Sequence, residues 1–198
     1  AQQAKRLPEI ERFAADAPVF IAGSTWPPDE ELLVGLIERY PDVKFIVAPH
    51  EIDPARIEKF CERISRPALR YTQLTPQSDL AAAGVLFVDT IGILSSVYRY
   101  GRWGYIGGGF GAGIHNTLEA ATFGLPLAFG PRYGKFREAR DLVTLRGAAS
   151  IASAEELERW FAGLHDDPDA TGRSGTICKE YVLQHKGATA RIMDEICR

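Results

Sequence analysis

The chain has 198 residues, of which 45% are hydrophobic and 25% charged, and its formal net charge is −3 at pH 7. This composition excludes a disordered chain, and the acidic balance disfavours a protein that binds nucleic-acid phosphates. Three cysteines are too few for a disulfide scaffold, and the sequence has no apolar run of about 18 residues that could cross a bilayer. The length suits one domain with a sizeable core.

Short apolar runs alternate with longer amphipathic stretches in the first half of the chain, which is typical of a parallel α/β sheet. A helix fits within the first dozen residues. The predicted elements that follow are a strand at 19–23, a helix at about 28–40, a strand at 44–48, a helix at about 57–64 and a short strand near 69–71.

The alternation continues in the second half of the chain. Strands are predicted at 85–88, 103–106, 125–129 and near 149–151, and helices at about 92–100, 114–123 and 177–197. Ser153 and Glu156 have the spacing of a capping box for a further helix, and residues 166–175 are predicted to form a polar loop. The fold class expected is therefore α/β, with a Rossmann-like parallel sheet flanked by helices.

A glycine-rich segment, residues 107–113, lies between a predicted strand and a predicted helix. Glycine lets backbone approach a ligand closely, and a helix start offers N–H groups to a phosphate. His115 and Glu119 are four residues apart and are predicted to share a helix face, with Asn116 beside them. This arrangement suits a nucleotide whose ribose is held by Glu119; the alternative is a flexible strand-to-helix turn capped by Asn116.

Other familiar motifs are absent from the sequence. Gly107, Gly109 and Ala112 match the loose dinucleotide fingerprint, but no acidic residue follows at the required distance of about 20 residues. The Walker pattern needs a hydroxyl after its lysine, and Phe136 follows Lys135. The histidines lack metal-ligand spacing, so no metal is expected. The acidic run 29–31 is interpreted as a solvated helix start.

Several segments, in the same order along the chain, resemble the C-terminal half of the 3-deoxy-D-manno-octulosonic acid (Kdo) transferases. The matching segments are Ala-Gly-Ser-Thr at 22–25, Val-Ala-Pro-His at 47–50, Asp-Thr-Ile-Gly-Ile-Leu at 89–94, Gly-Gly at 107–108, His-Asn-Thr-Leu-Glu-Ala-Ala at 115–121, Gly-Leu-Pro at 124–126 and Gly-Pro at 130–131. They cover most of residues 18 to 145.

The resemblance implies the C-terminal half of a GT-B glycosyltransferase, with residues 1–198 forming one nucleotide-sugar-binding domain. The N-terminal acceptor and catalytic domain would be absent from this chain, which agrees with Met193 being the only methionine. The implied donor is CMP-Kdo and the implied acceptor is a lipid A precursor in lipopolysaccharide biosynthesis. The whole enzyme would act at the cytoplasmic face of the inner membrane of a Gram-negative bacterium. The chain alone would be soluble and inactive, with no cofactor and no nucleic-acid partner.

The resemblance also implies which residues contact the donor. By position these are Pro49, His50, Gly92, Ile93, Leu94, Asn116, Thr117, Leu118 and Glu119, and no catalytic residue is expected in this chain. Many family members carry arginine at or beside His50, histidine in place of Trp26 and asparagine in place of Lys135. Either His50 or Lys135 is therefore expected to contact the phosphate.

The implied mechanism is direct displacement at the anomeric carbon, with the base on the absent half and the donor held by this half. Helix N–H groups near Asn116 are expected to offset the phosphate charge. Two alternatives are a different GT-B enzyme, such as a nucleotide-sugar epimerase, and a non-catalytic α/β module that binds a protein. Preference for uridine nucleotides would indicate the epimerase, and no nucleotide binding would indicate the module.

Overall fold

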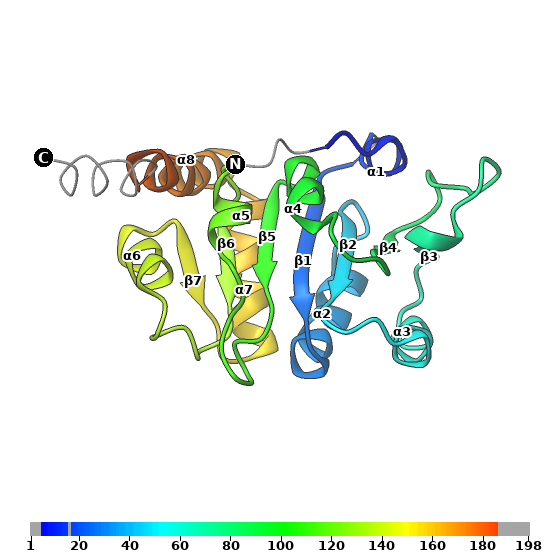
Figure 1. Cartoon of the computed structure of the whole chain (residues 1–198), viewed down its shortest axis with the longest axis horizontal. Helices are drawn as coiled ribbons and strands as arrows, with labels where there is room; N and C mark the ends of the chain where they lie inside the picture. Colours follow the sequence, from blue (N-terminus) through cyan, green and yellow to red (C-terminus); the bar gives the residue numbers. More distant parts are fainter. Residues whose placement is uncertain (1–4, 16, 186–198) are drawn as a thin grey trace, which may run out of the picture.

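Seven parallel strands form one sheet in the computed structural model, which describes residues 5–15 and 17–185. The strands are β1 (Val19–Thr25), β2 (Lys44–Pro49), β3 (Ala68–Arg70), β4 (Val85–Phe87), β5 (Trp103–Ile106), β6 (Leu127–Phe129) and β7 (Ala148–Ser150). Their order across the sheet is β3-β4-β2-β1-β5-β6-β7, with β1 at the centre (Figure 1). The predicted strands and the α/β fold class are confirmed.

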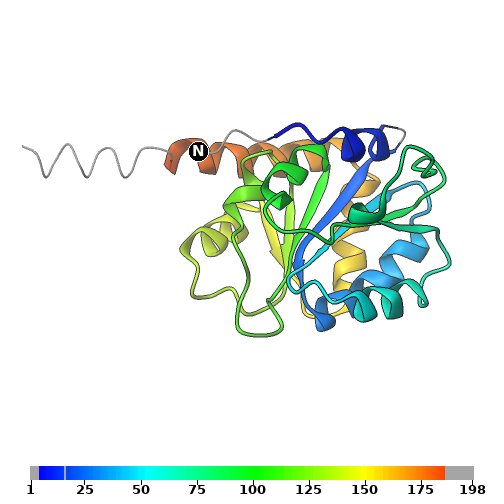
Figure 2. The same cartoon turned by 45° about the vertical axis from the view of Figure 1, so that its right-hand side comes forward.

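Helices cover both faces of the sheet, and this explains why the central strands β1 and β2 each carry several apolar residues in succession. Successive residues of β1 alternate between two hydrophobic clusters: Val19 and Ile21 belong to one, Phe20 and Ala22 to the other. The cluster that contains Phe20 and Ala22 also contains buried side chains of three helices, α2 (Pro27–Arg39), α3 (Pro54–Cys61) and α7 (Ala154–His165). Helix α2 packs beside α7 (Figure 2).

The first cluster is formed with five other helices. They are α1 (Pro8–Phe13), α4 (Leu94–Val97), α5 (Leu118–Ala121), α6 (Arg137–Leu145) and α8 (Pro168–His185). Two 3₁₀ turns, η1 (Tyr71–Gln73) and η2 (Tyr98–Tyr100), complete the elements of the described residues. Both α1 and α8 run along the edge where the strands begin, which leaves the edge where they end to the connecting loops (Figure 1). Ser153 Oγ accepts from the backbone N–H of Glu156 at the start of α7, which confirms the serine half of the predicted capping box. The Glu156 carboxylate accepts from the Ala152 N–H at 2.7 Å and not from that of Ser153.

The predicted polar loop at 166–175 is wrong, because α8 begins at Pro168. Thr171 is buried in this helix, where its hydroxyl accepts a hydrogen bond from Trp103 Nε1 at 3.1 Å and donates one to the Leu164 carbonyl at 2.7 Å. A Cβ on Gly175 would lie 2.2 Å from the Gly124 carbonyl oxygen, so this glycine permits close helix packing. The part of the predicted last helix at 186–197 lies outside the described residues.

Two predicted helices are shorter than expected, and one helix was not predicted. The helix predicted at 114–123 is only α5, Leu118–Ala121, because the preceding glycine-rich segment folds as irregular turns. The helix predicted at 92–100 is split into α4 and η2. Helix α6 is the one that sequence patterning does not predict. No helix within 5–15 or 17–185 is both long and apolar enough to cross a membrane.

His165, the last residue of α7, bridges two carboxylates. Its Nε2 lies 2.8 Å from Asp42 Oδ2, and its Nδ1 lies 2.8 Å from Asp166 Oδ1. Burial lowers the pKa of His165, but the hydrogen bonds to Asp166 and Asp42 outweigh it, so the net pKa is raised. A protonated ring donates to both carboxylates and ties α7 to the turn before β2.

The His165→Gln variant should therefore show a pH-dependent loss of stability. A raised folded-state pKa stabilises the fold fully below the ordinary histidine value of 6.5, and this contribution is lost as pH rises through the raised pKa. The difference in unfolding free energy between wild type and variant, measured by urea denaturation, should be largest at acidic pH and shrink toward pH ~9. A difference that is constant with pH would contradict this role.

Candidate functional site

A pocket lies at the carboxyl ends of β1, β2 and β5. Strands β2, β4 and β3 lie on one side of β1, and β5, β6 and β7 lie on its other side. The strand order therefore reverses at β1, and parallel α/β sheets bind ligands at such a switch point. The pocket has a volume of about 510 Å³, within the usual range for small-molecule sites. Its lining comes from three segments: Trp26, Pro28 and Asp29 after β1, His50 after β2, and Gly108, Phe110, Gly111, Ala112, Gly113 and His115 after β5.

A bulge at the end of β1 directs the chain into this pocket. The pairing of β1 with β2 shifts register between Gly23 and Thr25, and the intervening Ser24 has a φ of 54°, in the left-handed region. The Thr25 carbonyl then accepts from the backbone N–H of His50 at 2.9 Å. This bond brings the residues that follow the two strands, Trp26 and His50, side by side.

Three rings meet in the pocket. The ring of His50 stacks on Trp26, with centroids 4.6 Å apart, and also on His115, with centroids 4.3 Å apart. Trp26 Nε1 donates a hydrogen bond to His115 Nε2 at 3.2 Å. Since Nε2 accepts this bond, the proton of the neutral His115 ring is on Nδ1. Burial and the neighbouring His50 lower the pKa of His115, which keeps the ring neutral and the bond from Trp26 intact.

The glycine-rich segment packs tightly against β1, and this close approach requires glycine. A Cβ on Gly107 would lie 2.2 Å from the Ser24 carbonyl oxygen, a contact no other residue could make. Gly108 has a φ of 92° and turns the segment back over the pocket. Arg132, after β6, donates from Nη1 to the Gly111 carbonyl at 2.8 Å and holds the tip of the segment.

Asp29 lies beneath this segment, and the prediction that it is part of a solvated acidic run is wrong. It is 1% exposed, and its Oδ1 accepts from the Tyr105 hydroxyl at 2.6 Å. Its Oδ2 accepts from the backbone N–H groups of Gly108 and Trp26, both at 2.9 Å. One carboxylate thus joins the start of α2, strand β5 and the glycine segment, and its charge raises the pKa of Tyr105 further after burial has already raised it.

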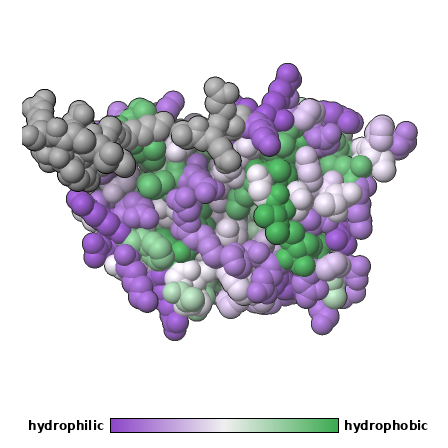
Figure 3. Space-filling model, in the orientation of Figure 1, coloured by the Kyte–Doolittle hydropathy of each residue, from purple (hydrophilic) through white to green (hydrophobic). Residues whose placement is uncertain are grey.

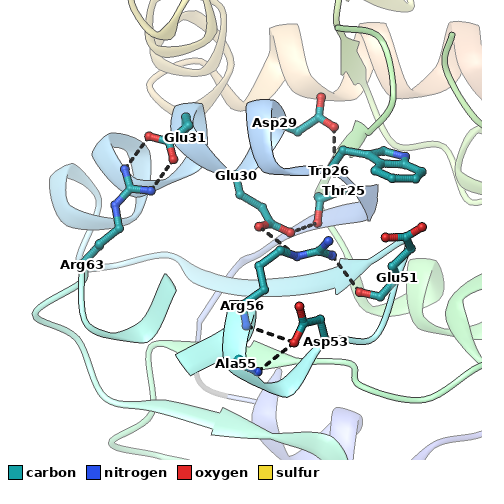
Figure 4. A network of polar contacts seen from close by, with 10 residues as sticks. All are labelled: Thr25, Trp26, Asp29, Glu30, Glu31, Glu51, Asp53, Ala55, Arg56 and Arg63. Carbon is teal, nitrogen blue, oxygen red and sulfur yellow. Dashed lines mark hydrogen bonds and ion pairs between the residues drawn. The ribbon is translucent and has the colours of Figure 1, made fainter. Parts of the chain in front are cut away.

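Glu30 is also buried, in a network that ties α2 to the loop after β2 (Figure 4). Its carboxylate accepts from Thr25 Oγ1 at 3.0 Å and lies 3.6 Å from Arg56 Nε. Burial raises the pKa of Glu30, and the Arg56 charge opposes this rise. Arg56 Nη2 donates to the Glu51 carbonyl at 2.7 Å and so fixes the loop that carries His50. Of the acidic run, Glu31 alone is exposed, and it pairs with Arg63.

The residues predicted to contact a donor fall into two groups. Pro49 ends β2 and is buried, and His50 beside it faces the pocket. The others lie on α4 and α5 and the turns before them. Gly92 has a φ of 87°, and Ile93 and Leu94 follow it. Leu94 lies over Gly23 of β1, where an added Cβ would come within 3.2 Å of its side chain.

The second group continues with residues 116–119. The predicted helix face shared by His115 and Glu119 is wrong, because α5 begins only at Leu118. Asn116 instead caps the turn: its Oδ1 accepts from the Leu118 N–H at 3.0 Å, and its Nδ2 donates to Glu119 at 3.1 Å. Thr117 is 1% exposed, and its Oγ1 has no hydrogen-bond partner within the described chain. Leu118 packs partly against the core, and α5 packs against η2.

Ile91 and Lys135 belong to neither group. Ile91, three residues before α4 begins, is 88% exposed. Hydrophobic side chains gather on the face drawn in Figure 3, near the position of α4 in Figure 1. Lys135, the other candidate for a phosphate contact, is exposed on the segment after β6, next to Phe136, which lies 3.3 Å from where a Cβ on Gly113 would be. Among residues 5–15 and 17–185, no cluster of three or more His, Cys, Asp or Glu side chains could hold a metal ion.

Sequence reasoning missed Asp29 as a component of this pocket. It named His115 only through a helix face shared with Glu119, and it treated Trp26 chiefly as a departure from the family pattern. The sequence signal for Trp26 is its position directly after β1. Because β1 lies beside β2, and His50 directly follows β2, the two residues are expected at the same edge of the sheet. The signal for Asp29 was its spacing three residues from Trp26, since a carboxylate at this helix position accepts from the capping residue's N–H.

Curated relatives cover most of this chain. It is 29% identical over 198 residues to the Kdo transferase of Rickettsia bellii, covering 96% of this chain and 46% of the relative. It is 25% identical over 182 residues to the Kdo transferase of Chlamydophila psittaci, covering 90% of this chain and 41% of the relative. The chain thus spans less than half the length of these relatives. No family model matches it.

Solved glycosyltransferase domains share the fold. The C-terminal CMP-Kdo binding domain of WaaA from Acinetobacter baumannii superimposes with a TM-score of 0.75 at 22% identity, covering 91% of this chain and all of that domain. The fold is that of a GT-B glycosyltransferase domain. Within this class, the predicted resemblance to the C-terminal part of the Kdo transferases is confirmed.

The Asp29→Ala variant should be clearly destabilised. It removes a buried acceptor and leaves the Tyr105 hydroxyl and the Gly108 N–H unpaired, at about 1–3 kcal/mol each. Tyr105→Phe removes one donor and leaves Oδ1 of the buried Asp29 carboxylate without its partner, so it should cost about 1–3 kcal/mol, less than Asp29→Ala, which unpairs several donors at once. Urea denaturation of both variants measures the two losses in unfolding free energy. Equal losses would show that Asp29 does not hold the glycine segment.

Proposed function

We infer that this chain binds CMP-Kdo as the donor-binding part of a Kdo transferase. The observation that carries the proposal is the pocket at the β1–β5 switch point, in a chain similar to Kdo transferases over most of its length. The whole protein would transfer Kdo to a lipid A precursor in lipopolysaccharide biosynthesis, at the cytoplasmic face of the inner membrane of a Gram-negative bacterium. That residues 1–198 alone bind the donor but do not transfer Kdo stays a prediction.

The proposed nucleotide contacts are Gly92, Ile93 and Leu94 for the base, with Glu119 accepting from the ribose hydroxyls. Asn116 orients Glu119 through the hydrogen bond from its side-chain amide. Thr117 carries a buried hydroxyl without a partner among the described residues, which is consistent with a polar group close to this turn.

The phosphate charge requires cations or N–H donors near the turn before α5. The Leu118 N–H is already bonded to Asn116, so the helix N–H groups expected to offset this charge are fewer than the sequence suggested. Side chains must supply more of the neutralisation. His50 in the pocket and Lys135 on the segment after β6 remain the two candidates.

The proposed chemistry is direct displacement at the anomeric carbon of the sugar. An acceptor hydroxyl, deprotonated by a base outside this chain, forms the new bond while the bond from the sugar to the CMP phosphate breaks. This chain would contribute by holding the donor in one orientation and by stabilising the departing CMP. The proposed displacement needs no cofactor and no metal ion from this chain.

Calorimetry with CMP, UMP and AMP tests the proposal against its alternatives. Preference for CMP is expected. Preference for UMP would favour a nucleotide-sugar epimerase, and no nucleotide binding would favour a protein-binding module. The Kdo transferase relatives favour the first outcome.

The Glu119→Ala variant should bind CMP about ten- to a hundredfold more weakly, because a hydrogen bond to a charged group contributes about 1.5–3 kcal/mol. Glu119 is half-buried, and its hydrogen bond from Asn116 is exposed to solvent, so the unfolding midpoint should change little. Calorimetry and thermal unfolding measure the two effects, with Asn116→Ala as a milder comparison. Unchanged CMP affinity in a folded variant would exclude the ribose contact, and a large drop in melting temperature would assign Glu119 a structural role.

A further inference from the structure

A groove lies beside β7, away from the pocket at the ends of β1, β2 and β5. Strand β7 is at one edge of the sheet, and β6 separates it from β5 (Figure 1). The end of α6, the first residues of β7 and parts of α7 and α8 line a volume of about 670 Å³, which is in the range of small-molecule sites. No residue lines both this groove and the donor pocket, so the two are separate sites.

Three arginines line this groove, and none of the described residues that line it is acidic. They are Arg146 at the end of α6, Arg159 on α7 and Arg173 on α8, and all three are exposed. Arg173 Nη2 lies 3.5 Å from Asp167 Oδ2, and the charge of Arg159 acts on Glu155. Neither of these carboxylates lines the groove, whose own charge is therefore positive and favours an anion.

The backbone of Arg146 is in a conformation that favours glycine. Its φ is 66°, in the left-handed region, at the C-cap of α6. The glycine of this turn stands one position later, where packing requires it: a Cβ on Gly147 would lie 2.9 Å from Ile177 Cγ2 and 3.0 Å from Cys178 Sγ. The chain thus keeps a charged side chain at a strained position, next to two other arginines, where glycine would fit better.

The remaining wall of the groove is largely apolar. Leu145 is 51% exposed, and Trp160 and Ile177 are partly exposed beside it. An alkyl chain lying on these side chains would remove apolar surface from water. A neighbouring hollow along α8 shares Arg173 and Ile177 with the groove but includes the carboxylate of Asp169, which disfavours an anion there.

We propose that this groove binds an anionic amphiphile, a molecule with a carboxylate or phosphate head on an aliphatic chain, such as a fatty acid or a lipid phosphate. Arg146, Arg159 and Arg173 hold the head, because a planar guanidinium pairs with two oxygens of a carboxylate or phosphate at once. The aliphatic chain lies on Leu145, Trp160 and the apolar side chains around them. This site is additional to the proposed donor pocket and does not depend on it.

Calorimetry on the 198-residue chain tests the site with decanoate and decyl phosphate, each below the concentration at which it forms micelles. Decyl maltoside has the same chain with a neutral head, and inorganic phosphate has a charged head without the chain. Both decyl anions should bind at least about tenfold more tightly than either comparison ligand. The tighter of the two shows whether the head is a carboxylate or a phosphate. Decyl maltoside or inorganic phosphate binding as tightly as the decyl anions, or no binding of either anion, would overturn the proposal.

Variants of the arginines identify the groove. Arg159→Gln and Arg173→Gln should each weaken the binding of decyl phosphate about two- to fivefold, as expected for an exposed ion pair. Arg146→Gly should weaken it equally while the thermal unfolding midpoint stays the same or rises, because glycine suits a φ of 66°. Arg12→Gln, which removes an exposed arginine from α1, is the matched control and should bind like wild type. Groove variants that bind as tightly as Arg12→Gln would exclude the arginines as the anion site.

NMR locates the ligand independently of affinity. The chain has three tryptophans, so the indole N–H signal missing in Trp160→Phe is that of Trp160, and Trp26→Phe identifies the Trp26 signal in the same way. Decyl phosphate should shift the Trp160 signal and leave the Trp26 signal unmoved. The opposite pattern would place the ligand in the donor pocket and overturn the proposed groove site, whether or not the chain binds CMP.

Discussion

The buried carboxylate of Asp29 is the interaction on which the site depends. It joins the first turn of α2 to the Tyr105 hydroxyl of β5 and to the Gly108 N–H of the glycine segment. A carboxylate out of water is costly unless its oxygens are hydrogen-bonded, and here three donors offset that cost. The bonds also fix two walls of the pocket relative to each other, so the pocket has a defined shape without a ligand to organise it.

The same region contains a second buried carboxylate with a different task. Glu30 pairs with Arg56 and Thr25, and Arg56 in turn holds the Glu51 carbonyl. Asp29 thus fixes the β5 side of the pocket, and Glu30 fixes the β2 side, where His50 lies. Adjacent residues in the first turn of one helix control the two loops that enclose the site.

The glycines after β5 serve packing as much as ligand binding. Gly107 lies against the Ser24 carbonyl, and the segment then folds back so that the Gly108 carbonyl accepts from the Gly111 and Gly113 N–H groups. Amides bonded in this way are not available to a phosphate. These bonds, with the cap from Asn116, support the interpretation of the segment as a structural turn that forms a wall of the pocket. Its interpretation as part of a nucleotide site stays a prediction.

The sequence by itself determined the parallel sheet, because runs such as 45–48 are apolar at successive positions, and only strands covered on both faces need that pattern. It also determined that polar residues after β1, β2 and β5 would meet at one edge, since the carboxyl ends of parallel strands coincide. It could not place Asp29, because an acidic residue at a helix start is solvated or buried depending on donors from Tyr105 and Gly108, which are 76 and 79 residues away. Nor could it show that 168–175 is helical, since the reason for glycine at 175 is the close approach of the Gly124 carbonyl, which leaves no room for a Cβ. The hydrophobic periodicity of the sequence determines which segments form strands and helices. Only the tertiary structure determines which polar side chains meet hydrogen-bond partners that are distant in the chain.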